Sequence, residues 1–349
     1  PDQISDLEHL NPTRLAIPSS WVSDKEVIKA LGKMSHPAWY LGFSSVTSPT
    51  NARSFIPCLL PECGVGNSFP IMLQESHDAA MITKLYACTS CYILDFVARQ
   101  KIGGVNLNFF LVKQFPALDV EVANMGSAYS ADALTKHVAG LVLELTYTAW
   151  DMQNYSQNLG YEGPPFIWDD ERRFQIRCEL DALFFHLYLG TQSIWESSPT
   201  QAPEMALGSG QPHAGSTHSI QGESSRQPSL LAAHPSRNPA HPSPLTAYFP
   251  TPRHAVDYIM ESFPIVKRKD EKAHGYYRTK QRILEFYDAM APLFQSSSGS
   301  SQPSQTIYTS PLDPPPGPPC DAEGNFIPAE KWDENSWPAH IHKPGGASE

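Results

Sequence analysis

The stretch Ala98–Leu118, which reads ARQKIGGVNLNFFLVKQFPAL, joins a helical pattern to an extended one. Its helical part ends in a polar turn followed by Gly103 and Gly104, and paired glycines after a basic last turn predict a helix stop, because glycine reaches positive φ without a Cβ clash. The apolar run Val105–Val112 that follows predicts a strand, which Pro116 closes soon afterwards. The stretch therefore predicts a helix-to-strand corner.

This corner concentrates side chains of a kind that can read nucleic acid. Arginine, lysine, asparagine and glutamine pair with base edges and hold phosphates. The same side chains are also typical of an ordinary solvated surface, and composition alone leaves both interpretations open. The polar residues at the corner are Arg99, Gln100, Lys101, Asn106, Asn108, Lys113 and Gln114, and all of these except Gln114 are candidate contacts.

Upstream of the corner, short runs indicate two strands and a long helix. Trp39–Val46 and Ser54–Leu60 are aromatic or β-branched and are separated by a Ser/Thr/Pro/Asn-rich turn, a pattern typical of strands. In Ser76–Lys101, apolar residues recur at steps of three and four, which predicts one amphipathic helix. Arg53, at the end of the turn, is either a further DNA contact or a surface arginine beside an edge strand.

Cysteine spacing raises the alternative of a zinc site. Cys88 and Cys91 form a Cys-x-x-Cys pair, with Cys58 and Cys63 upstream. The pair falls in the middle of the predicted helix, whereas a zinc ribbon needs its ligands on a knuckle loop. We therefore expect small buried side chains and no metal.

Downstream, the chain alternates between helical and low-complexity segments. Helices are predicted over Ser127–Asp151 and from Asp169 or Asp170, as N-cap, to Leu189, with Gly190 as the stop. Residues 191–252 are rich in Ser, Pro, Gly and Gln, which predicts a disordered insertion. Order is expected to resume over Ala255–Phe294, as two helices joined by the basic connector KRKDEKAHGYYR, which contains Lys267, Arg268 and Lys269. Residues 295–349 are expected to form a Pro-rich, partly polyproline II tail that docks locally through Trp332 and Trp337.

The order of these segments resembles the C-terminal specificity region of type IIG-like restriction–modification enzymes with an adenine-specific DNA methyltransferase core. The resemblance covers most of residues 39–292. Its matching pieces are WYLGFSSVTSPTNARSFIPCLLP, GVGNSFPIML, DFVARQKIGG, NLNFFLVKQFPAL, LELTYTAWDMQNYSQNLGY, GPPFIWDDERRFQIRCELDALFFHLYLG and DYIMESFPIVKRKDEKAHGYYRTKQRILEFYDAMA.

This resemblance implies a module that binds double-stranded DNA and sets sequence specificity. Base-edge contacts are expected from Arg53, from Arg99–Lys101 and from Asn106–Asn108, and backbone contacts from Lys113 and Lys267–Lys269. The chain has neither an FxGxG-type motif nor an Asn/Asp-Pro-Pro-Tyr/Phe motif, which hold S-adenosylmethionine and the flipped adenine in such methylases. We therefore expect no cofactor in this chain and methyl transfer by a catalytic domain or subunit upstream, with or without a fused endonuclease.

The expected architecture is α+β. A small mixed sheet packed on helices should occupy residues 39–120, a mostly helical part residues 121–190 plus 253–294, and a connector to a preceding part residues 1–38. The cysteines lack the regular spacing of a disulfide scaffold, which fits a reducing cytoplasm, and no apolar run is long enough to span a membrane.

Charge favours a competing interpretation. The formal net charge of −11 lacks the positive footprint usual in nucleic-acid binders, so a non-catalytic structural or protein-interaction module is the alternative. An independent hydrolase is disfavoured, because the sequence has no nucleophile elbow, HExxH motif or PD-(D/E)xK-type carboxylate cluster.

Overall fold

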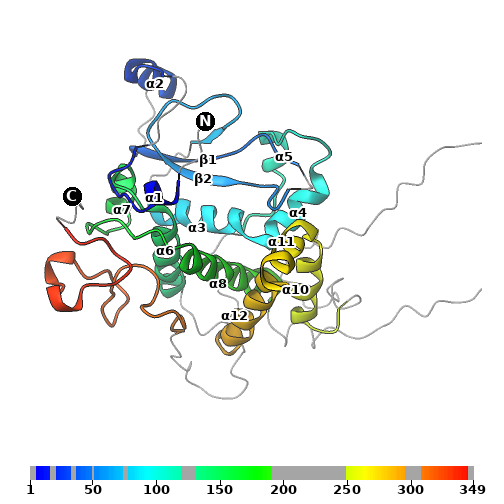
Figure 1. Ribbon diagram of the computed structural model, residues 1–349. Helices are drawn as coiled ribbons and strands as arrows, with labels where there is room; N and C mark the ends of the chain where they lie inside the picture. Colours follow the sequence, from blue (N-terminus) through cyan, green and yellow to red (C-terminus); the bar gives the residue numbers. More distant parts are fainter. Residues whose placement is uncertain are drawn as a thin grey trace, which may run out of the picture.

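The computed structural model confirms the α+β class: a small sheet lies on one side of a set of packed helices (Figure 1). The structure describes residues 5–15, 21–32, 37–48, 51–73, 78–118, 131–190, 249–294 and 308–344. Residues 191–248 of the predicted insertion lie outside the described residues. The predicted boundary at residue 252 is slightly late, because Thr251 is the N-cap of a helix.

The elements follow one another in this order: α1 (Asp6–His9), α2 (Asp24–Leu31), β1 (Trp39–Phe43), β2 (Pro57–Pro61), β3 (Ile71–Met72), α3 (Ala79–Ser90), α4 (Tyr92–Lys101), α5 (Phe109–Val112), α6 (Ala131–Thr146), the 3₁₀ turn η2 (Trp150–Met152), α7 (Gln153–Asn158), α8 (Asp170–Leu189), α10 (Pro252–Glu261), α11 (Pro264–His274), α12 (Arg278–Phe294), and the 3₁₀ turns η3 (Ala329–Lys331) and η4 (Glu334–Ser336).

The sheet has the strand order β2–β1–β3, and both of its pairings are antiparallel, where a mixed sheet was expected. Trp39 pairs with Pro61 and Gly42 with Cys58, while Leu41 faces Met72 across the other edge of β1. Every residue of β1 is buried. This central strand lies between its two partners, and Trp39 and Phe43 at its ends pack edge-on against Tyr155 and Phe55.

The single helix predicted over Ser76–Lys101 is instead two helices that meet at 65°. Cys91 between them has extended backbone (φ −82°, ψ 156°). The Asp181 carboxylate on α8 accepts a hydrogen bond from the Tyr92 backbone N–H at 2.6 Å, so it satisfies a donor that a continuous helix would have used. A contact from a distant element therefore decides the break.

The strand predicted over Val105–Val112 was also wrong for most of its length. Only Asn106 forms a bridge, with Val46, and the chain then winds into α5. The Asn108 side chain accepts a hydrogen bond from Leu111 N at 3.1 Å and so caps this helix turn. The predicted glycine stop is absent as well, since α4 ends at the extended Ile102 and neither Gly103 nor Gly104 has positive φ.

Local sequence signals predicted the helix ends in the second half of the chain better than those in the first half. Asp169 caps α8 by accepting from Arg172 N, and Gly190 ends that helix at φ +72°. The basic connector is an exception, since most of it forms α11. Pro264 supplies the fixed φ of a first helical residue, and Gly275 closes the helix in the left-handed conformation.

The Pro-rich tail packs on the core through two buried glutamates. On α6, Glu144 forms an ion pair with Arg172 and accepts from Gly317 N at 2.8 Å. On α8, Glu179 accepts from Ser310 Oγ at 2.7 Å. Trp332 and Trp337 dock as expected, with Trp332 stacked on Tyr161 of the core. One continuous cluster of buried apolar residues runs from Trp39 to Ile341, so the described parts of the two expected domains and the tail share a core.

Gly317→Ala should destabilise the protein by about 2 kcal/mol or more. Gly317 has φ +85°, and a Cβ there would lie 2.7 Å from Gly140 Cα, a backbone atom that cannot move aside alone. Gly275→Ala is the matched control, because Gly275 has φ +82° with nothing within 4 Å. Urea unfolding should show a clearly larger loss for Gly317→Ala, and equal losses would contradict the tail packing.

The buried His186 should make stability depend on pH. Its Nε2 donates to Tyr287 O at 2.7 Å, its ring stacks on Tyr287 and Phe294, and burial lowers its pKa to about 4. The unfolded chain takes up this proton below about pH 6.5, so the stabilisation is complete above that pH and is lost as pH falls towards 4.

Between pH 7 and about pH 4.5, wild type should therefore lose roughly 2–3 kcal/mol more than His186→Gln, which cannot titrate. Urea unfolding at both pH values measures the difference. Parallel pH profiles for the two proteins would show that His186 is not the titrating group.

Candidate nucleic-acid interface

Three segments distant in sequence meet where β1 ends, and Ser45 joins them. Its backbone N–H and its hydroxyl both donate to Ser68 O at 2.9 Å, and its carbonyl accepts from Leu107 N at 2.7 Å. A further bond runs from Thr47 N to Val105 O at 2.9 Å. Backbone hydrogen bonds therefore fix the positions of the side chains that these segments present.

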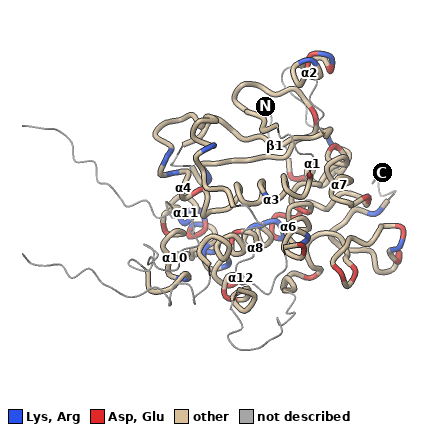
Figure 2. Tube along the Cα trace, turned by 180° about the vertical axis from the view of Figure 1, so that it is seen from behind, with Lys and Arg blue, Asp and Glu red and all other residues tan. Residues whose placement is uncertain are grey.

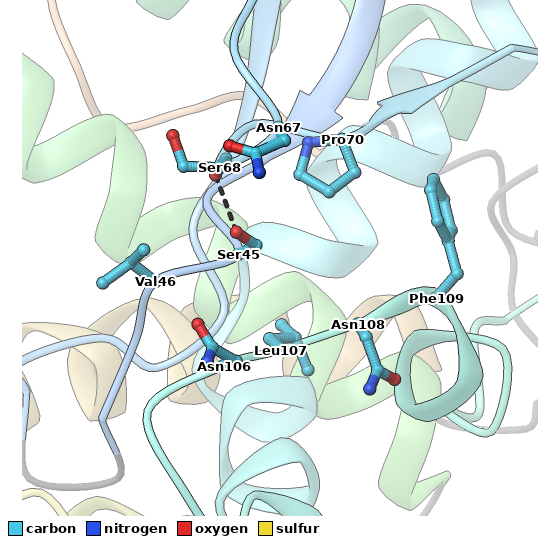
Figure 3. A pocket seen from close by; sticks show the side chains of 9 residues that line it. All are labelled: Ser45, Val46, Asn67, Ser68, Pro70, Asn106, Leu107, Asn108 and Phe109. Atoms are coloured by element: carbon cyan, nitrogen blue, oxygen red, sulfur yellow. Dashed lines mark hydrogen bonds between the residues drawn. The ribbon is translucent and has the colours of Figure 1, made fainter.

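A hollow of about 380 Å³ lies between the three segments (Figure 3). In the view of Figure 3, Asn67 and Asn106 lie on opposite sides of the Ser45–Ser68 contact. Both asparagines are exposed, and their amide groups form no hydrogen bond within the described part of the chain. We call this feature the amide hollow. Its lining residues are Ser45, Val46, Asn67, Ser68, Pro70, Asn106, Leu107, Asn108 and Phe109.

Exposed apolar side chains surround the amide hollow. Val46 is 59% exposed, Val105 65% and Phe110 74%, whereas Phe109 is 40% exposed and touches the core edge-on through Phe43. A surface that combines free amides with exposed apolar groups can offer hydrogen bonds and apolar contacts to the same partner.

Arg99 is placed beside this corner, and its donors are directed into the protein. Its Nε donates to Asp95 at 3.1 Å, and its Nη2 donates to the carbonyls of Asn51 and Ala52. Asp95 is buried and also accepts from the backbone N–H groups of Ser54 and Phe55 at 2.8 and 2.6 Å. This Asp95–Arg99 pair fastens the loop before β2 to α4.

Arg53 is held in a similar way. Its Nη2 donates to Asp181 at 3.0 Å, and its guanidinium carbon lies 3.3 Å from the centre of the Tyr92 ring. Burial opposes the charge, but Asp181, Tyr92 and Asp95 together outweigh that cost and raise the pKa of Arg53 above its ordinary value. Arg53 and Arg99 therefore support the corner from within, and neither extends from it as expected.

The other expected contacts differ in whether their side chains are paired within the protein. Gln100, Lys101 and Lys113 are exposed, and their side chains form no hydrogen bond or ion pair within the described residues. The neighbouring Gln114 donates a hydrogen bond to Phe110 O. On α11, Lys267 pairs with Glu261 at 2.8 Å, whereas Arg268 and Lys269 are exposed and without a described partner.

The two basic regions lie at the same end of the molecule. The guanidinium of Arg99, on the last turn of α4, lies 4.2 Å from the ring of Phe263, which precedes α11. In Figure 2, basic positions appear on the loops beside α4 and along α11, with acidic positions among them. The positive charge is therefore local, on a chain whose net charge is −11.

Sequence reasoning missed Asn67, Ser45 and Ser68. Asn67 and Ser68 follow Gly66 in a turn between two strands, and such a turn is a local signal for side chains that face solvent. Their proximity to Asn106 could not be inferred, because it depends on the pairing of residues 45–47 with 105–107.

Cys88 and Cys91 are buried packing residues as expected, whereas Cys58 is only partly buried and Cys63 is exposed. Cys91 Sγ donates to Cys88 O at 2.8 Å, and Cys88 Sγ lies 3.1 Å from the Tyr188 hydroxyl. Burial raises the pKa of both thiols. No group of three or more His, Cys, Asp or Glu side chains in the described ranges is arranged to hold a metal ion.

No single helix among the described residues is long and apolar enough to span a membrane, and only the bent pair α3–α4 reaches that length and composition together. Comparison of the chain with models of known families, with curated proteins and with solved structures found no match.

Asp95→Asn should cost about 3 kcal/mol of stability, because the new amide N–H₂ faces the Arg99 donor and leaves a buried charge without its partner. Asp132→Asn is the control, since Asp132 forms an exposed i,i+4 pair with Lys136 on α6 and should cost less than about 0.5 kcal/mol. Chemical unfolding of both variants tests this, and a small loss for Asp95→Asn would refute the fastening role.

Proposed function

We propose that this chain is the DNA sequence-recognition portion of an S-adenosylmethionine-dependent, site-specific adenine DNA methyltransferase of the restriction–modification type. The observation that carries the proposal is the amide hollow, in which Asn67 and Asn106 are presented on backbone held by Ser45. A free asparagine amide carries one donor and one acceptor, the pair that adenine offers in the major groove.

The apolar rim of the hollow fits the same ligand. Val46 and Phe109 line the hollow beside the two amides. Thymine displays a methyl group in the major groove, and apolar side chains recognise it by contact. A site of two amides and two apolar groups is therefore suited to A·T pairs.

The free cations serve as backbone contacts in this proposal. Lys101 and Lys113 flank the segment that contains Asn106, with Gln100 beside them. Arg268 and Lys269 continue the positive surface along α11, to which Lys267 contributes less because Glu261 neutralises it. Phosphate contacts position a protein on the duplex, and base contacts specify the sequence.

Hydrogen bonds within the protein change the roles of three expected contacts. Arg53 and Arg99 become positioning residues, because Arg53 pairs with the buried Asp181 and Arg99 binds Asp95 and two backbone carbonyls. Asn108 offers only its amide N–H₂, since its oxygen caps α5.

The catalytic part of the proposal rests on the family resemblance of residues 39–292. Methyl transfer and base flipping belong to a catalytic domain or subunit upstream, which also binds S-adenosylmethionine. This chain contributes double-stranded DNA recognition to that enzyme.

A protein-interaction module is the second candidate, and the exposure of Phe110 and Val105 favours it. Apolar side chains this exposed are typical of a surface that another protein covers. The two candidates differ in the response of binding to salt, because only duplex binding releases condensed counterions.

The decisive experiment is binding of the full chain to a pool of random duplexes at several salt concentrations, followed by sequencing of the bound fraction. Asn106→Ala should relax the selected sequence at one position, a loss of about 1–3 kcal/mol of discrimination. Lys101→Ala should weaken binding to all sequences alike and reduce the salt slope by about 1.

Lys331→Ala is the matched control, because Lys331 is exposed on η3, at the end of the molecule away from α4 and α11 (Figure 1). It should leave affinity and salt slope unchanged. Absence of salt-dependent duplex binding would reject the DNA proposal and favour the interaction module.

A further inference from the structure

A second cavity, of about 190 Å³, lies below the start of β2, between the α3–α4 break and α8. Three arginines line it: Arg53 from the loop before β2, and Arg173 and Arg177 from α8. Asp181 is the one acidic residue among the lining residues. Tyr86 and Ser90 add hydroxyl groups to a wall that is otherwise apolar. We call it the arginine cavity.

Hydrogen-bond donors of these arginines remain unused. Arg173 Nη1 donates to Leu145 O at 2.8 Å and its guanidinium stacks on Trp168, but its Nε is buried and forms no hydrogen bond in the described part of the chain. The same holds for Nη1 of Arg53. Buried donors are normally paired, since an unpaired one gives up its hydrogen bonds to water without a replacement.

Charge in the cavity is also unbalanced. Asp181 already accepts from Arg53 and from Tyr92 N, while Arg173 and Arg177 repel each other at i,i+4 on α8. Burial and the neighbouring Arg177 lower the pKa of Arg173 to about 10, and Asp170 and Tyr86 only partly offset this. Arg177 is exposed and forms no hydrogen bond or ion pair within the described ranges.

We infer that the arginine cavity binds a small phosphate-class oxyanion between Arg53, Arg173 and Arg177. Such an anion accepts several hydrogen bonds at once, and the guanidinium fork matches its geometry. It would pair the unused donors and neutralise the excess positive charge. The ligand is either a free oxyanion or a phosphate of a DNA backbone, and the inference holds for the first even if the proposed DNA function fails.

Thermal unfolding of the full chain in sodium phosphate and in sodium chloride of equal ionic strength tests the inference, with inorganic phosphate as the probe. Phosphate should raise the midpoint of wild type, because a ligand that binds only the folded state stabilises it. Arg177→Gln should fold, since Arg177 is exposed and unpaired among the described residues, and it should bind phosphate at least about tenfold more weakly by calorimetry. Lys331→Gln is the matched control and should keep the full phosphate response, because it removes an exposed cation on η3 that does not line the cavity.

Removing Arg177 also removes a repulsion, so Arg177→Gln should unfold at the same temperature as wild type or higher in chloride. A lower midpoint there would point to a structural role and contradict the inference. An equal phosphate response in wild type and Arg177→Gln, or none in wild type, would overturn it.

A short duplex at constant ionic strength identifies the source of the anion. If phosphate competes with the duplex and Arg177→Gln weakens both, the cavity takes a backbone phosphate. If Arg177→Gln weakens phosphate alone, the ligand is a free anion. Failure of duplex binding with an intact phosphate response would remove the DNA proposal and leave the cavity.

Discussion

The Asp181 carboxylate on α8 is the contact on which the middle of the structure depends. One oxygen caps α4 through Tyr92 N, and the other holds Arg53, whose guanidinium stacks on the Tyr92 ring. A buried carboxylate is costly unless hydrogen bonds and an opposite charge surround it, and here both do. Without this acid the helix break at Cys91 would leave unpaired backbone donors in the core.

Asp95, one turn further along α4, is a second buried acid that accepts hydrogen bonds from the backbone of a distant segment. Its carboxylate holds the backbone of Ser54 and Phe55, and Arg99 adds two carbonyls of the same loop. The loop leads into β2, which pairs with β1, and β1 continues into the segment that Ser45 anchors. Asp95 and Asp181 therefore fix the backbone on which the amide hollow is built, and the exposed groups around the hollow remain available to a partner.

The tail follows the same pattern, in which buried acids accept hydrogen bonds from a distant segment of the chain. Glu144 binds Gly317 N and Arg172, and Glu179 binds Ser310. Proline restricts the conformations of the unfolded tail, which lowers the entropy lost on docking. A segment with few branched apolar residues can thus pack on a core when charged groups in the core supply its polar contacts.

Local chemistry controls several features that can be predicted from the sequence: the α+β class, the buried stripes, the Asp169 cap, the Gly190 stop and the change of composition after it. The break at Cys91 could not be predicted in this way, because its cause, Asp181, lies on another helix. Tertiary packing also decides that Arg53 is turned inward and that Asn67 and Asn106 line the same hollow, since ion pairing and strand pairing join residues far apart in the chain. A pattern of residue types shows which side chains are available, and packing decides which of them face solvent.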